Sequence, residues 1–78
     1  MQDLIKFIIS SIIDKPEKLI CEEVVSSTGV TNYIVHVDPE DMGKVIGKKG
    51  QIIQAVRTLI RVRALKEGKK AFLTLAED

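Results

Sequence analysis

Apolar side chains recur at helical spacing in the N-terminal part of the chain. This first helical segment begins near Leu4 and ends at Asp14-Lys15-Pro16, because proline cannot continue a helix and restricts the residue before it. Phe7 and Ile13 lie outside its main apolar face, so we expect the helix to be covered on more than one side. The face itself consists of Leu4, Ile5, Ile8 and Ile12, with Ile9 at its edge.

Three other segments have the composition of strands. Residues 18–27 are apolar on both sides of the charged pair Glu22-Glu23, although their alternation is imperfect. Turn-forming residues follow, and Tyr33–Val37 is β-branched and aromatic, so the two segments are predicted to form a hairpin. Near the C-terminus, a closing strand is predicted because Ala71, Leu73 and Leu75 alternate with Phe72 and Thr74.

A short and a long helix are predicted between the second and third strands. Asp38 can cap the short helix, Pro39 suits its first position, and acidic Glu40 and Asp41 favour its first turn. The long helix spans residues 51–66 and ends at a glycine. The face that we expect to pack on the sheet consists of Ile52, Ile53, Val56, Leu59 and Ile60.

A second apolar stripe on the long helix consists of Ala55, Val62 and Leu65. A two-layer domain covers one side of such a helix, and a connected exposed stripe often marks an interface. We therefore expect contact with a second copy of the chain or another protein, and cover by the first helix is the alternative. The order of elements is α-β-β-α-α-β, and the 78 residues are expected to form one domain, 1–78.

Charged side chains are distributed unevenly along the chain. Residues 1–43 carry three basic and eight acidic side chains, whereas residues 44–70 carry nine basic and one acidic. The formal net charge of +1 hides this separation. A concentrated basic segment is typical of a protein that binds a polyanion, although an ordinary solvated helix face can have the same composition.

The basic segment is centred on Gly47-Lys48-Lys49-Gly50, which joins the short helix to the long one. Glycines at these positions indicate a tight connection in which a side chain would obstruct the turn or an approaching ligand. A helix that begins there offers free backbone N–H groups and a partial positive charge. Together with the two lysines, these groups predict a cradle for phosphate.

The stretch Val45-Ile46-Gly47-Lys48-Lys49-Gly50-Gln51-Ile52-Ile53 resembles the V-I-G-x-x-G-x-x-I signature of KH domains, which bind single-stranded nucleic acid. The predicted order of elements is that of the type II KH fold, so the resemblance extends from Leu4 to Leu75. The small chain is also similar to the stand-alone bacterial KhpA family. This resemblance implies a two-layer α+β fold in which a three-stranded sheet is backed by three helices.

The resemblance also implies an RNA-binding site. Its phosphates would be held by the loop, and the flanking aliphatic residues, which include Ile52, would line a groove for bases or anchor the helices in the core. The strand segment Ile34–Val37 would form the far wall of the groove, and two further cations would extend the positive field. The implied contacts are Gly47, Lys48, Lys49, Gly50, Lys44, Val45, Ile46, Ile53 and Arg57.

The same resemblance implies a cytoplasmic RNA-binding protein that acts as an RNA chaperone. It implies pairing with itself or with a larger KH protein of the KhpB type, and a role in the control of the cell envelope and cell length. With one Tyr, two Phe and no Trp, the chain is poor in stacking platforms, so we expect weak base preference.

Several other classes of function are disfavoured. A lone Cys21 excludes an intramolecular disulfide, and with a single His36 there is no cluster of metal ligands, so no metal or cofactor is expected. We expect both residues to be structural and Cys21 to be buried in a strand. No nucleophile–base pair indicates an enzyme. Residues 43–49 have three residues between their glycines, rather than the four of a P-loop. The apolar run Leu4–Ile13 is too short for a bilayer, so a cytosolic location is the default expectation.

Two classes of function remain after these exclusions. The first is an RNA-binding module that acts through the lysine loop. The second is a protein-interaction or dimerisation module, in which the loop is vestigial and its lysines are merely solvated. A DNA-binding helix-turn-helix is a weaker alternative, because its turn usually lacks two lysines between glycines.

Overall fold

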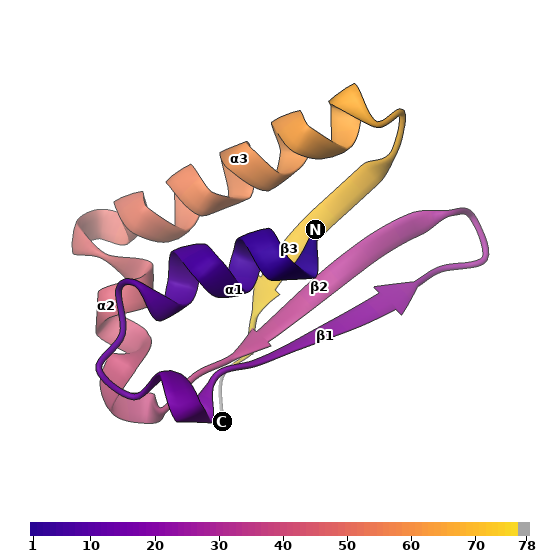
Figure 1. The fold of residues 1–78 in the computed structure, drawn as a ribbon. Helices are drawn as coiled ribbons and strands as arrows, with labels where there is room; N and C mark the ends of the chain where they lie inside the picture. The colour runs from indigo at the N-terminus through magenta and orange to yellow at the C-terminus, as the bar shows by residue number, and fades with distance from the viewer. Residues whose placement is uncertain (77–78) are drawn as a thin grey trace.

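Three helices cover one face of a three-stranded sheet (Figure 1). The computed structural model describes residues 1–76, so the last two positions of the expected domain 1–78 lie outside the described residues. The α-β-β-α-α-β order and the two-layer α+β arrangement confirm the prediction of a type II KH fold. The elements are α1 (Gln2–Ser10), β1 (Ile20–Val25), β2 (Val30–His36), α2 (Met42–Ile46), α3 (Gln51–Lys66) and β3 (Lys70–Leu75).

Short 3₁₀ turns connect several of these elements. Pro16–Lys18 lies before β1, Pro39–Asp41 leads into α2, and Lys48–Gly50 lies between α2 and α3. The predicted cap is confirmed at the second of these turns, where the Asp38 carboxylate accepts a hydrogen bond from the Glu40 N–H at 2.9 Å. These turns let the chain change direction at both ends of α2 without a long loop.

The central strand of the sheet is β2. It pairs antiparallel with β1, from Ile20↔His36 to Val25↔Thr31, and parallel with β3, from Val30↔Lys70 to Val35↔Leu75. The β1–β2 hairpin was predicted from the turn residues between the strands. The parallel pair follows from the two helices that intervene between β2 and β3, since a parallel neighbour requires a crossover connection.

The core lies between the sheet and the helices. Cys21 is buried as predicted, and its burial raises the pKa of the thiol above its ordinary value. The inner face of the sheet is otherwise apolar, which supports close packing by α1 and α3. The core side chains on these elements are Ile5, Ile9, Tyr33, Val35, Val56, Ile60, Ala64, Ala71 and Leu73.

Two predictions about helix faces were partly wrong. In α1, which already ends at Ser10, Ile9 is fully buried rather than marginal, and Ile13 is buried beyond the helix, where the chain folds back. In α3, Leu59 is 54% exposed, and Ala64 occupies the core instead. The reason is the helical period: Ala64 continues the row of Ile53, Val56 and Ile60, whereas Leu59 is rotated toward the side of the helix.

Candidate nucleic-acid interface

The Gly47–Gly50 loop is a tight turn with unusual backbone geometry. Positive φ angles occur at Gly47 (76°), Lys49 (56°) and Gly50 (74°), and the Gly50 N–H donates a hydrogen bond to the Gly47 carbonyl at 3.1 Å. Lys49 is the one non-glycine residue with a positive φ in the described part of the chain. An L-residue in this left-handed region costs about 1 kcal/mol or more, and such strain tends to occur at functional positions.

The loop presents its two lysines to solvent at the start of α3. Lys48 and Lys49 are both exposed, and neither has an ion-pair partner within residues 1–76. No side chain caps α3, whose N-cap residue is Gly50. The positive end of the helix dipole and two unpaired ammonium groups therefore face the same region of solvent, an arrangement suited to an anion.

The structure distinguishes the two roles that the sequence left open for the aliphatic residues. Val45 is 0% exposed and Ile53 is nearly as buried, so both side chains anchor their helices in the core and are not available for direct contact with RNA. Ile46 and Ile52 are only partly buried and lie on either side of the loop. Of the predicted aliphatic contacts, Ile46 therefore keeps accessible surface, and Val45 and Ile53 support the loop from beneath.

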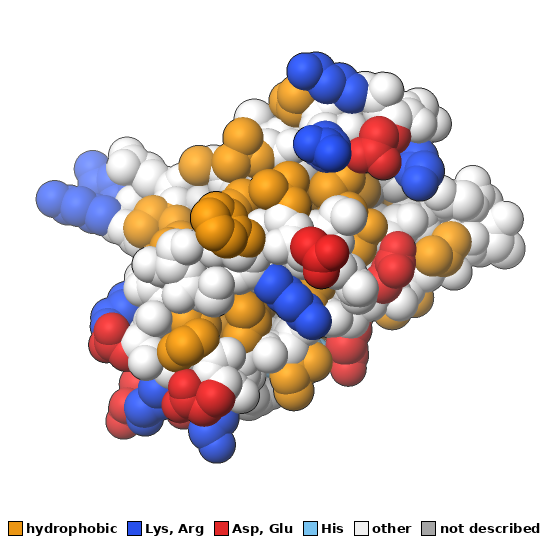
Figure 2. Space-filling model, viewed as in Figure 1, with side chains coloured by type: hydrophobic (Ala, Val, Ile, Leu, Met, Phe, Trp, Pro, Cys, Tyr) orange, Lys and Arg blue, Asp and Glu red, His pale blue; other side chains and the backbone are white. Residues whose placement is uncertain are grey.

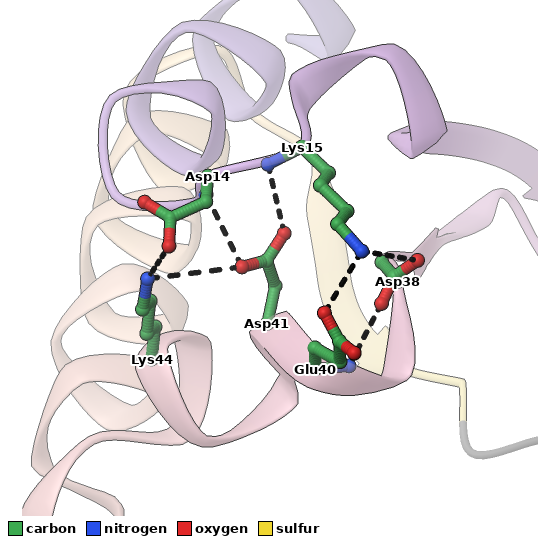
Figure 3. A network of polar contacts seen from close by, with 6 residues as sticks. All are labelled: Asp14, Lys15, Asp38, Glu40, Asp41 and Lys44. Atoms are coloured by element: carbon green, nitrogen blue, oxygen red, sulfur yellow. Dashed lines mark hydrogen bonds and ion pairs between the residues drawn. The ribbon is translucent and has the colours of Figure 1, made fainter.

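A buried carboxylate fixes the position of α2 relative to the connection between α1 and β1 (Figure 3). Asp41, which is 2% exposed, accepts hydrogen bonds from the backbone N–H groups of Asp14 at 3.1 Å and Lys15 at 3.0 Å. Asp41 was predicted only as an acid of a first helical turn, and these two hydrogen bonds were not predicted. Spacing along one helix gives no sign of a partner 26 or 27 positions away.

Lys44 lies on the side of α2 that faces the carboxylates of Asp14 and Asp41. Its ammonium group donates to Asp14 and lies 4.0 Å from Asp41 Oδ1, and the hydrogen bond to Asp14 raises the pKa of Lys44 (Figure 3). The nearby Lys15 makes a similar pair with Glu40 at 2.8 Å, which raises the pKa of Lys15. The positive field expected from Lys44 is therefore partly offset by neighbouring carboxylates.

Arg57 links α3 to the last strand. Its Nε donates a hydrogen bond to the Leu73 carbonyl at 3.2 Å, beside a groove of about 300 Å³ between α3 and β3. The prediction that Ile34–Val37 would form the far wall of the groove was wrong, because β1 and β3 cover both edges of β2. The groove is lined by Arg57, Arg61, Ala71, Phe72, Leu73 and Thr74.

The sequence contained a signal for this corrected wall. Two helices between β2 and the last strand indicate a parallel pair, and an added parallel strand lies at the edge of β2 that β1 leaves open. The edge strand then presents its outer backbone groups next to α3, as the Leu73 carbonyl shows. For Lys70–Leu75, the order of elements therefore indicates a strand that lies beside α3.

Other kinds of site find little support in the described residues. No three His, Cys, Asp or Glu side chains gather there as they would around a metal ion. Within residues 1–76, no helix has both the length and the apolar content to cross a membrane.

Comparisons with known proteins identify the family of this chain. The family described as "KhpA/KhpB, KH domain" matches residues 2–75. "RNA-binding protein KhpA" of Clostridium perfringens is 41% identical over 75 residues, which cover 96% of this chain and 99% of the relative. The proteins of the same name from Caldanaerobacter subterraneus and Listeria monocytogenes serovar 1/2a are 42% and 39% identical over 77 residues, covering 96% and 99% of this chain and 99% and 100% of the relatives. No solved structure matches the chain significantly. On this sequence match, which extends over nearly the whole chain, the protein belongs to the KhpA/KhpB KH-domain family.

Proposed function

We propose that this protein binds single-stranded RNA through the backbone phosphates at the Gly47–Gly50 loop. The observation that carries the proposal is the joint placement of Lys48 and Lys49, unpaired within the described residues, at the uncapped start of α3. Its relatives are named RNA-binding proteins, which supports the choice of RNA as the polyanion. A GXXG loop that clamps the backbone is the mode of binding known for KH domains.

The groove between α3 and β3 is the proposed path for the bases. Arg57 lies at its near end, about two helical turns after the loop that directly precedes α3. Four acids gather between the connection after α1 and the start of α2 (Figure 3), where they would repel a phosphate backbone: Asp14, Asp38, Glu40 and Asp41. This distribution of charge favours an RNA strand that runs from the loop along α3. Lys44 contributes positive charge at the boundary between the two regions.

Reversal of the two loop charges tests this proposal. Lys48→Asp with Lys49→Asp keeps both glycines, and exposed substitutions usually change stability by no more than about 0.5 kcal/mol. We expect the affinity for oligouridine, measured by fluorescence anisotropy, to fall by about tenfold or more. The matched control is Lys6→Asp with Lys18→Asp, which changes the net charge equally at exposed positions on α1 and before β1. If both double variants lose affinity for oligouridine equally, the binding depends on net charge alone, and the loop assignment is contradicted.

Salt dependence gives an independent measure of the phosphate contacts. On a single strand, log affinity falls with log salt by about 0.7 for each phosphate neutralised. Some two to four contacts predict a slope of roughly −1.4 to −2.8, which should become flatter in the loop double variant. A flat response of the unmodified protein would mean that its basic segment does not contact the backbone.

An apolar surface on α1 and α3 supports a second function, contact with another protein chain. Phe7 is 72% exposed, and Val62 and Leu59 are about half exposed beside the partly buried Leu4 and Ile8. Figure 2 shows hydrophobic side chains gathered over these two helices. A cavity of about 230 Å³ is lined by Leu4, Ile8, Leu59 and Val62 together with Arg63 and Lys66. We call Leu4, Phe7, Ile8, Leu59 and Val62 the α1/α3 patch. The proposed partner is a second copy of this chain or a larger KhpB-like KH protein.

The remaining parts of the proposal rest on family resemblance. They are an RNA-chaperone activity in the cytoplasm and a role in control of the cell envelope and cell length. The chaperone activity predicts faster annealing of two complementary RNA strands that each form an internal hairpin. The loop double variant should lose this acceleration, whereas the Lys6→Asp, Lys18→Asp control should keep it. Failure of the unmodified protein to accelerate annealing would remove the chaperone part and leave RNA binding in place.

A further inference from the structure

The side of α3 that faces β3 carries a row of side chains which begins at the RNA-binding loop. Arg57, Arg61 and Leu65 are four residues apart, so they lie on one side of the helix, and Gly50 falls on the same side by helical spacing. This side differs from the one that carries Leu59 and Val62, which lies toward α1. The predicted stripe of Ala55, Val62 and Leu65 is thus divided, and Leu65 belongs to the β3 side.

A second cavity lies at the far end of this row. It has a volume of about 190 Å³ and shares Arg61, Ala71 and Phe72 with the groove beside Arg57, so the two hollows are continuous. Its other lining residues come from the end of α3 and the start of β3. They are Leu65, Lys69 and Lys70.

Phe72 lines both this cavity and the groove beside Arg57. Its neighbours in β3, Ala71 and Leu73, are buried in the core, whereas Phe72 is 52% exposed. Three cations surround it, because Arg61, Lys69 and Lys70 line the same cavity. None of the three has an ion-pair partner among the described residues, and the nearby Glu67 is paired with Arg63 at 3.1 Å.

We propose that this cavity is a second, distal nucleotide site, in which a base stacks on Phe72 while Arg61, Lys69 and Lys70 neutralise the adjacent phosphates. Aromatic side chains bind unpaired bases by stacking, and cationic grooves follow the backbone of a single strand. The inference rests on the proposed RNA binding at the loop and adds a separate anchor to it. A polypeptide ligand would leave three cations unmatched unless it were strongly acidic, so the charge of the site favours RNA.

The length of α3 determines which RNA reaches both sites. Its 16 residues span about 24 Å at 1.5 Å per residue. A KH loop clamps about four nucleotides, and a stacked strand covers about 3.4 Å per nucleotide. A tetranucleotide at the loop therefore covers the groove beside Arg57 and reaches the near side of Phe72, whereas a strand of about eight or more nucleotides also reaches Leu65, Lys69 and Lys70. The distal site predicts a gain in affinity that depends on RNA length.

Oligouridines of four and twelve nucleotides, U4 and U12, test the distal site in the whole protein. Phe72→Leu removes the aromatic ring and keeps an apolar side chain, and Phe72→Trp keeps a stacking surface as the matched control. We expect Phe72→Leu to weaken U12 binding by about tenfold and U4 binding by less, because Phe72 also lines the groove beside Arg57. Phe72→Trp should bind U12 as tightly as the parent protein. Lys69→Gln with Lys70→Gln should weaken U12 binding and reduce its salt dependence.

NMR chemical shifts provide a readout that needs no variant. Backbone amide signals of residues 47–50 should move with both oligonucleotides, and those of Lys69 and Lys70 should move with U12 only. Signals of residues 69–72 that stay unchanged with U12, or Phe72→Leu binding U12 as the parent does, would overturn the distal site. The distal site is equally contradicted if Phe72→Leu weakens U4 and U12 to the same extent, or if oligoglutamate of equal charge binds residues 69–72 as tightly as U12.

The loop variants separate this inference from the proposed function. If Lys48→Asp with Lys49→Asp abolishes binding of both oligouridines while the Phe72 variants behave as the parent does, RNA binding at the loop stands and the distal site is wrong. If the parent protein binds neither oligouridine, the proposed function itself is wrong, and the distal site fails with it.

Discussion

The side chain of Ile52 occupies the space that any side chain on Gly47 would need. A Cβ atom built on Gly47 would lie 2.5 Å from Ile52 Cγ1 and 2.8 Å from its Cβ, whereas a Cβ on Gly50 would meet nothing within 4 Å. Ile52 Cβ is bonded directly to the backbone, so a rotamer change alone does not relieve this overlap. The two glycines of the loop are therefore required for different reasons: Gly47 for conformation and space, and Gly50 for conformation alone.

Alanine substitutions distinguish these two requirements. Gly50→Ala places an L-residue at a φ of 74° and should cost about 1 kcal/mol of unfolding free energy. Gly47→Ala combines a backbone conformation suited to glycine with overlap against Ile52, so we expect a loss of about 3 kcal/mol. Urea denaturation measures both values. Equal losses would show that Ile52 moves away freely and that the close approach has no energetic consequence.

Asp41 and Glu40 form a matched pair of neighbouring acids in different environments. Asp41→Ala removes the acceptor for the backbone N–H groups of Asp14 and Lys15, so we expect a loss of about 1–3 kcal/mol. Asp41→Asn retains one acceptor oxygen and should lose less. Glu40→Ala removes an exposed ion pair and should change the stability by less than about 0.5 kcal/mol. A small effect of Asp41→Ala would mean that the connection after α1 finds other partners.

Stability should fall in alkaline solution. Burial raises the pKa of Cys21 above 9.0, and hydrogen bonds raise those of Lys15 and Lys44 above 10.5. Each group then holds its proton more tightly in the folded state than in the unfolded chain, so its contribution is complete below the ordinary pKa and declines as the pH rises through the folded value.

The variant Cys21→Ala tests the first part of this decline. It removes the group with the lowest of these ordinary pKa values, so its unfolding free energy should depend less on pH just above pH 9.0 than that of the parent. Urea denaturation from about pH 8 to about pH 11 gives the two slopes. If the unfolding free energy of Cys21→Ala has the same pH dependence as that of the parent, groups other than Cys21 cause the loss of stability just above pH 9.0. Cavity formation at Cys21 lowers stability at every pH and leaves this comparison intact.

The α1/α3 patch predicts self-association. Val62→Glu introduces a charge at a position that is 48% exposed, so the chain should stay folded, and sedimentation should detect a monomer where the parent forms a dimer. Its affinity for long RNA should also fall, because a dimer offers two linked loops. Ser27→Glu adds the same charge at the exposed hairpin turn and serves as the control.

Two results would contradict the prediction for the patch. If the parent is monomeric at high concentration, the homodimer is wrong, and the heterologous KH partner becomes the remaining candidate. If Val62→Glu unfolds the protein, the side chain belongs to the core rather than to an interface.

Local patterns predicted most of the elements, and long-range contacts explain the differences. The bounds of α3 and its end before Gly68 followed from spacing and a glycine signal. The burial of Ala64 in the core was not predicted, because alanine adds little to an apolar pattern even where it lies against a sheet. Burial of Asp41 depends on a chain segment about 26 residues away, which no pattern around it specifies.

The candidate site shows the same division. The turn at Gly47–Gly50 and the exposure of its lysines follow from local chemistry, and both were predicted. The position of Lys44 beside Asp14 depends on how distant segments dock, and that of β3 beside α3 follows from the order of the elements rather than from the motif. The motif therefore located the loop and left the direction of the groove undetermined.

The parallel pairing of β2 with β3 has a consequence for the order of folding. The hairpin of β1 and β2 closes over a few residues, whereas β3 pairs with β2 only after residues 37–69 have been looped back. Closing such a long loop is slow, because conformational entropy of the chain is lost before the β2–β3 contacts form. The turn at Gly47–Gly50 lies inside this closure and can form early, whereas the groove between α3 and β3 needs the last strand in place. During synthesis, this groove is thus completed only after residues 70–75 have left the ribosome.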